Sequence, residues 1–144
     1  MPEKIGELEN LARVGKLARE RGTPGEIKGL LSSGSERLAD ARNGNLALSS
    51  RFDLAYNAAH AFSLAALRWH GYRSDSRYLV FQTLPHTLGV PAAVWRVLAK
   101  AHEMRNVAEY EGHLDADAAM LKNLIDAAEA VRTSVTARPA LAED

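Results

Sequence analysis

The segment from about Ser49 to His70 constrains the fold most, because it reads as one long helix with two apolar faces. The two faces consist of Phe52, Tyr56, Ala59, Phe62 and Ala66, and of Leu54, Ala58, Ala61 and Ala65. A helix that is apolar on two faces packs against neighbours on both sides, so it belongs at the centre of a helical bundle. Its many small residues would let the neighbouring helices approach closely.

The rest of the chain follows the helical period as well, and no segment alternates as a strand does. Thr23, Pro24 and Glu26 form a helix start with a capping box. The expected helices run from about Glu3 to Arg21, from Pro24 to the turn at 43–45, from Ser49 to His70, over 78–88, from Pro91 to Gly112 and from about Asp117 to Thr136. A kink or break is expected near 32–35, and Pro85 should bend or end its helix.

These patterns predict an all-α fold, an up-and-down bundle of five to six helices. The whole chain, 1–144, reads as a single domain, since no linker or repeat interrupts it. Within it we expect an N-terminal helix or extension over 1–22, the bundle over about 24–136, and a flexible tail over 138–144.

Composition excludes several classes of protein. Of the 144 residues, 18 are Lys or Arg and 18 are Asp or Glu, so the net charge is zero and charge-driven binding of duplex DNA is not expected. The absence of cysteine excludes disulfides, thiolate catalysis and cysteine-ligated zinc. No apolar run approaches the roughly 18 residues of a membrane span, and the N-terminus lacks a signal-peptide core. We therefore expect a cytoplasmic protein that does not enter a membrane.

A polar cluster is predicted in the helix that ends at Gly112. Its members share one arc at spacings i, i+3, i+4 and i+7, with Tyr110 at the edge: His102, Arg105, Asn106 and Glu109. Arg105 continues an otherwise apolar stripe through Val94 and Leu98. Because charged groups are rarely buried without a partner, Arg105 requires either a carboxylate of the protein, such as Glu109 one turn away, or an anion from outside.

The central helix offers a second group of polar residues on one face, at i, i+3 and i+7: Asp53, Tyr56 and His60. One interpretation is that Tyr56 and His60 are amphipathic core residues whose polar tips reach the edge of the bundle. The other is that this helix faces the Arg105 helix and completes a polar pocket. No HExxH pattern, Glu-x-x-His pair or glycine-rich phosphate loop occurs, so we expect no metal and no cofactor. A nucleophilic triad stays undetermined, because no motif frames any serine or threonine.

Two blocks of the sequence resemble the HEPN domain (higher eukaryotes and prokaryotes nucleotide-binding). The first is SRFDLAYNAAHAFSLAALRWHGYR, from Ser50 to Arg73, which is similar to the family's helix of aromatics and alanines ending in glycine. The second is AKAHEMRNVAEYEG, from Ala99 to Gly112, which is similar to its late helix with an arginine followed by a polar residue. The resemblance covers roughly Leu30 to Val135.

The resemblance implies an all-α fold, a homodimer and, in many members, metal-independent cleavage of RNA. The family's motif is an arginine, a polar residue, three variable residues and a histidine, matched here by Arg105 and Asn106 but with Tyr110 at the histidine position. Imidazole suits acid and base roles near neutral pH, whereas a phenol, whose usual pKa is about 10, suits neither. The resemblance also implies a nucleotidyltransferase-type antitoxin as partner.

The sequence thus leaves three hypotheses for function. The first is a non-catalytic dimer that binds a nucleotide, an RNA phosphate or a partner protein at the Arg105 face, through His102, Arg105, Asn106, Glu109, Tyr56 and His60. The second is an endoribonuclease of a toxin–antitoxin system, whose catalytic residues would be Arg105, Asn106 and Tyr110, with His102 assisting. The third is a structural or regulatory helical protein.

Overall fold

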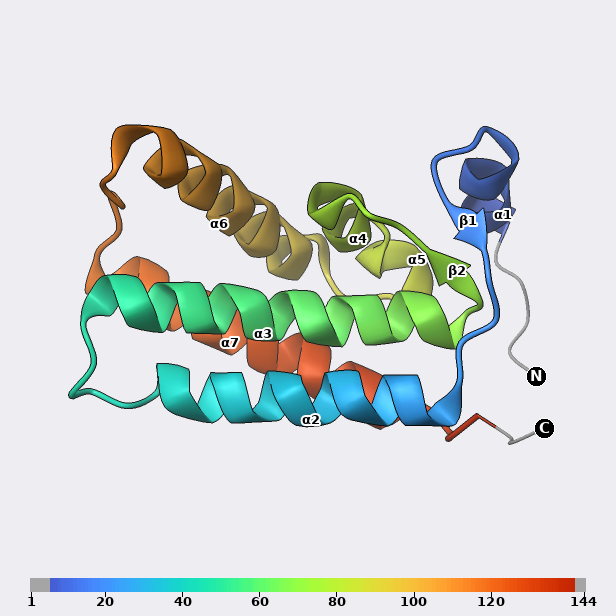
Figure 1. Ribbon diagram of the computed structural model, residues 1–144, viewed down its shortest axis with the longest axis horizontal. Coiled ribbons are helices and arrows are strands. Elements are labelled where there is room, and N and C mark those ends of the chain that lie inside the picture. Colours follow the sequence, from blue (N-terminus) through green and yellow to red (C-terminus); the bar gives the residue numbers. More distant parts are fainter. Residues whose placement is uncertain (1–5, 142–144) are drawn as a thin grey trace.

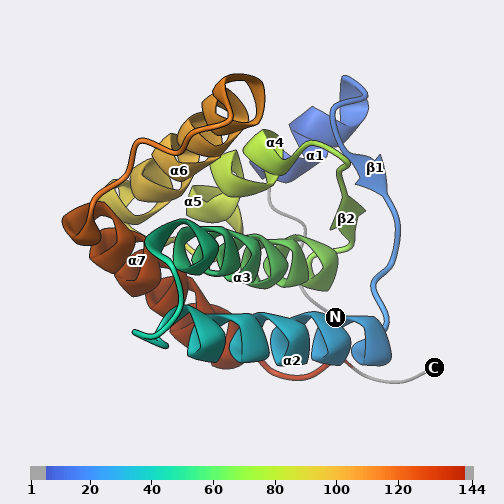
Figure 2. The same cartoon turned by 60° about the vertical axis from the view of Figure 1, so that its left-hand side comes forward.

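The predicted all-α bundle is confirmed by the computed structural model, which describes residues 6–141 (Figures 1 and 2). The described residues form seven helices and one pair of very short strands. In chain order these are α1 (Gly6–Arg13), β1 (Ala18–Arg19), α2 (Pro24–Ala41), α3 (Leu48–Trp69), β2 (Tyr72–Arg73), α4 (Arg77–Gln82), α5 (Leu84–Thr87), α6 (Ala92–Glu111) and α7 (Ala118–Thr136). None of the helices within 6–141 combines the length and apolar character that a membrane crossing needs.

Helix α3 lies at the centre of the bundle, as its two apolar faces predict. Figure 2 shows α2 and α7 along one side of it, with α4, α5 and α6 along the other. Phe52, Tyr56 and Phe62 are almost fully buried along its length. Because α3 is enclosed on both sides, its polar residues meet side chains from helices that are distant in sequence.

Helix α2 packs closely on α3 at Gly34, and the expected break near 32–35 does not occur. A Cβ atom on Gly34 would lie 2.6 Å from Cε1 of Phe62, so only glycine fits without a shift. The weak helix propensity of glycine and serine is overridden by this packing. At the start of α2, the predicted capping box is present: Thr23 accepts from the Glu26 backbone, and Glu26 accepts from the Thr23 backbone.

The prediction of one N-terminal helix to Arg21 is wrong. Helix α1 ends at Arg13, the chain turns at Gly15 with a φ of 82°, and β1 pairs antiparallel with β2. The predicted start of that helix, at residues 3–5, lies outside the described residues. A buried Arg68 explains the change, because it donates hydrogen bonds to the backbone carbonyls of Glu20 and Arg21 and holds this segment extended along α3.

The second half of the chain follows the sequence signals more closely. The expected helix is broken at Thr83 into α4 and α5, and Pro85 lies in the first turn of α5, where its missing backbone donor costs least. Helix α6 ends at Glu111 and is capped by Gly112, whose φ of 70° is the left-handed conformation that favours glycine. The segment assigned to a flexible tail begins with contacts to the bundle. Trp69 donates to the Pro139 carbonyl and Arg138 to that of Thr87, whereas 142–144 lie outside the described residues.

Candidate functional site

Polar side chains from α3, α4 and α6 meet on one side of the bundle. We call this set the polar cluster: Asp53, Tyr56 and His60 from α3, Arg77 from α4, and His102, Arg105 and Asn106 from α6. The two groups of residues singled out in the sequence therefore do face each other. The contact between α4 and α3 adds Arg77, which the sequence patterns did not indicate.

Tyr56 is the residue on which the polar cluster converges. Its side chain is fully buried, and its ring packs edge-on against Phe81 at 5.8 Å between centroids. The hydroxyl oxygen lies 2.9 Å from Nδ1 of His102. Burial raises the pKa of Tyr56, opposed by hydrogen bonding and charge from Arg77. The phenol is thus kept neutral and serves as a hydrogen-bonding group.

His102 is held through both ring nitrogens. Its Nε2 lies 3.1 Å from the Asn106 amide nitrogen, which donates to it, so the ring proton is on Nδ1 and points to the Tyr56 oxygen. Burial lowers the pKa of His102, and the charges of Arg77 and Arg105 lower it further. The imidazole is therefore neutral at pH 7.

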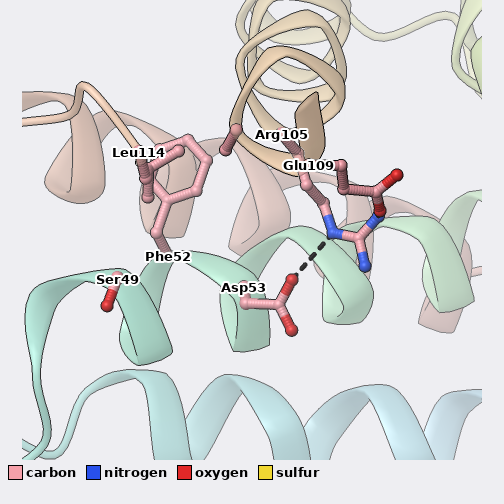
Figure 3. Close-up of a pocket in the computed structure, with 7 residues that line it drawn as sticks. Ser49, Phe52, Asp53, Arg105, Glu109 and Leu114 are labelled. Carbon is pink, nitrogen blue, oxygen red and sulfur yellow. Dashed lines mark hydrogen bonds and ion pairs between the residues drawn. The ribbon is translucent and has the colours of Figure 1, made fainter. Parts of the chain in front are cut away.

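Arg105 carries two carboxylate partners. Its Nε donates to Asp53 Oδ1 at 2.7 Å, and Nη1 donates to Glu109 Oε1 at 3.1 Å. Figure 3 shows the guanidinium beside both carboxylates. The hydrogen bond that Arg105 donates to Asp53 is the main cause of a raised pKa at Arg105. The Glu109 pair considered from the sequence is present, together with a second partner that spacing along one helix does not reveal.

Arg77 is the second guanidinium of the cluster. Its Nη1 donates to Asn57 Oδ1 at 2.9 Å, and its guanidinium carbon lies 5.6 Å from the centre of the Tyr56 ring. The corresponding distance for Arg105 is 5.0 Å. Arg77 stands in the first turn of a short helix, where no periodic pattern links it to α3 or α6. The sequence could have indicated it only as a basic residue next to the aromatic Tyr78.

His60 is half-buried beside Arg77 and Phe81. Its ring is edge-on to Phe81 at 6.0 Å. Burial, followed by the charge of Arg77 and the neighbouring His102, lowers the pKa of His60 to about 4. His60 is thus a neutral residue at the inner edge of the cluster rather than a cationic ligand group.

Tyr110 does not join the polar cluster. Its side chain is 92% exposed, on the part of α6 that faces solvent. The residue at the histidine position of the HEPN motif therefore lies apart from Tyr56 and His102 in this chain. Comparisons of the chain with protein-family models, curated proteins and solved structures give no match. Membership of the HEPN family stays a prediction.

A pocket of about 210 Å³ opens beside Arg105 (Figure 3). It is lined by Ser49, Phe52, Asp53, Arg105, Ala108, Glu109 and Leu114. Two of its four polar residues are carboxylates, so this pocket repels anions in spite of the guanidinium. Among the described residues, no three histidine, aspartate or glutamate side chains are grouped as a metal site would require.

Proposed function

We propose that this protein binds the phosphate group of a nucleotide or of RNA at the polar cluster, without cleaving it. The observation that carries the proposal is that two guanidinium groups, Arg77 and Arg105, lie against the same buried ring of Tyr56. Guanidinium groups bind phosphate through paired N–H donors. Their contact with an aromatic ring orients them before a ligand arrives, which reduces the entropy lost on binding.

The neighbouring groups suit a phosphate that is held by hydrogen bonds. The Asn106 amide is exposed beside His102, so it can donate to an oxygen of the ligand. Asp53 balances the charge of Arg105, which keeps the cluster stable when no ligand is bound. These features support recognition of an anion at one place rather than diffuse attraction over a surface.

Binding without cleavage is favoured by the position of Tyr110. An acid or base must reach the reacting atoms, and the Tyr110 side chain is almost fully exposed to solvent. The resemblance implies a homodimer and a nucleotidyltransferase-type partner, and both stay predictions. If a second copy or a partner protein binds, we expect it to cover the exposed side chains of Val107 and Tyr110 on α6.

Cleavage of RNA is the second candidate, and His102 is the observation that favours it. Its imidazole is neutral, lies next to Arg105 in the chain's fold, and is oriented by Tyr56 and Asn106. A neutral, oriented imidazole is a suitable general base for attack by a 2′-hydroxyl once that hydroxyl replaces the Asn106 amide as the donor to Nε2. In this reading Tyr110 takes no part.

The test is binding and cleavage of fluorescent single-stranded RNA with a chelator present. The double variant Arg77→Gln/Arg105→Gln should lose binding, because both guanidinium groups are removed. The charge-matched control is Arg96→Gln/Lys100→Gln, on a separate groove between α6 and α7, and it should bind like the wild type. Equal loss in both double variants would show that only net charge matters. Cleavage that disappears in His102→Gln would establish the second candidate instead.

A further inference from the structure

Resting on the proposed function, we propose that Arg77 and Tyr78, at the start of α4, form the subsite for one nucleotide. Arg77 binds its phosphate and Tyr78 stacks on its base. Arg105, the arginine singled out from the sequence, then mainly stabilises the structure of the site. The ligand class is a nucleoside phosphate, either free or as one unit of a single-stranded RNA.

The two arginines of the polar cluster differ in whether a carboxylate of the protein already balances their positive charge. Arg105 forms ion pairs with Asp53 and Glu109. Among the described residues, Arg77 has no carboxylate partner, and its acceptors, the Asn57 amide oxygen and the Tyr56 hydroxyl, are both neutral. A phosphate at Arg105 would have to displace or approach two carboxylates bonded directly to it. At Arg77 the Asn57 amide stands between the guanidinium and the Asp53 carboxylate, so a phosphate meets no carboxylate bonded to Arg77 itself. Electrostatics therefore favours Arg77 as the phosphate ligand.

Arg77 is also held in place before a ligand binds. It is half-buried, tied to Asn57 and set against the Tyr56 ring. Its charge is felt inside the cluster, since it lowers the pKa of both His60 and His102. The same positive charge that disfavours protonation of the two histidines would stabilise an anion bound beside them.

Tyr78 supplies an aromatic surface next to that charge. Its side chain is 42% exposed, and its ring lies 5.7 Å from the His102 ring at an angle of 48°. Aromatic rings exposed beside a cationic group serve as stacking platforms for unpaired bases. Arg77 lies against the Tyr56 ring and Tyr78 against the His102 ring, and these two rings are 6.1 Å apart between centroids. The phosphate and the base of one nucleotide can therefore reach Arg77 and Tyr78 together.

A single-stranded ligand fits this arrangement better than a duplex. Bases in a duplex are stacked on each other and do not offer a face to Tyr78. Binding to duplex backbones relies on an extended basic surface, and this chain has a net charge of zero. The subsite therefore recognises a base and a phosphate at one point.

The test compares four probes by calorimetry and fluorescence anisotropy: adenosine 5′-monophosphate, adenosine, inorganic phosphate and a single-stranded oligoadenylate. Arg77→Gln should weaken the monophosphate and phosphate about tenfold or more and leave adenosine unchanged. Tyr78→Leu should weaken the monophosphate and adenosine by roughly tenfold and leave phosphate unchanged, whereas Tyr78→Phe should bind like the wild type. Circular dichroism of each variant checks its fold, and Arg77→Lys provides a variant that keeps the charge.

The outcomes separate this inference from the proposed function. If Arg105→Gln abolishes binding while Arg77→Gln and Tyr78→Leu bind as the wild type does, the subsite is overturned and the proposed function stands. If the wild type binds none of the four probes, both are overturned. Tighter binding of the oligoadenylate than of the monophosphate identifies an RNA strand as the ligand, and equal affinity identifies a free nucleotide.

Discussion

At the level of single residues, the polar cluster depends on groups that are buried yet keep hydrogen-bonding capacity. Tyr56 is enclosed by the bundle, but its hydroxyl reaches His102, and its ring supports two guanidinium groups. His102 in turn connects Tyr56 to Asn106 at the surface. A chain of hydrogen bonds thus runs from the core to solvent, and removing its inner end should be costly because a partly buried nitrogen of His102 loses its partner.

We predict that Tyr56→Phe destabilises the protein by about 1–2 kcal/mol, since it deletes the hydroxyl and leaves Nδ1 of His102 without its partner. Urea denaturation measures the change. Tyr110→Phe removes the same atom from a side chain that is 92% exposed, and it should stay within about 0.5 kcal/mol of the wild type. Equal effects of the two variants would mean that the Tyr56–His102 bond contributes nothing.

We predict that His60 makes the fold sensitive to mild acid. Its pKa in the folded chain, about 4, lies below the ordinary value of 6.5, so the unfolded chain takes up the proton first as pH falls. The stabilisation that neutral His60 gives the folded chain is complete above pH 6.5 and is lost between pH 6.5 and about 4. This loss lowers the free energy of unfolding by at most about 3 kcal/mol. The free energy of unfolding should vary less with pH across this window in His60→Leu than in the wild type. In His113→Leu, which replaces an exposed histidine, it should vary with pH as in the wild type. An unchanged slope in His60→Leu would contradict the assignment.

At the level of helices, the position of the cluster follows from how closely α2 and α3 pack. Gly34 lets α2 approach the Phe62 ring, and α3 is thereby fixed against α2 on one side. The opposite side of α3 is left for α4 and α6, which bring Arg77 and Arg105 to Tyr56. The site is thus built from a contact between helices and not from one continuous motif.

We predict opposite effects for two glycine-to-alanine changes in α2. Gly34→Ala should destabilise by about 1–2 kcal/mol, because the clash with Phe62 outweighs the gain in helix propensity. Gly29→Ala, on the exposed face with nothing near its Cβ position, should stabilise by about 0.5–1 kcal/mol. Thermal unfolding of the two variants provides the comparison, and stabilisation of both would show that the α2–α3 contact is looser than described.

At the level of the whole molecule, the fold was predictable because helix period and stop signals are local. The amphipathic pattern of α3 predicted its central position, and Gly112 and Pro85 predicted where helices end. The pairing of β1 with β2 was not predictable, since a two-residue strand has no period and depends on Arg68 binding distant carbonyls.

The polar cluster was predictable in part, because spacing along a helix is also a local signal. Spacing along single helices placed Asp53 with Tyr56 and His102 with Arg105, because residues three and four apart share a helix face. The choice of Asp53 as a partner of Arg105 depends on how α3 and α6 are set against each other, which spacing does not encode. Arg77 depends on a third helix, α4, and was missed.

The most direct test of phosphate binding at the polar cluster is to follow the histidine imidazole signals by NMR while single-stranded RNA is added. We predict that the signals of His60 and His102 shift in a saturable way, because a phosphate beside Arg77 and Arg105 changes the charge that both imidazoles feel. The signal of His113, in the exposed segment after α6, should stay in place. Binding that leaves His60 and His102 unmoved, or moves them no more than His113, would contradict the proposal and place the ligand elsewhere.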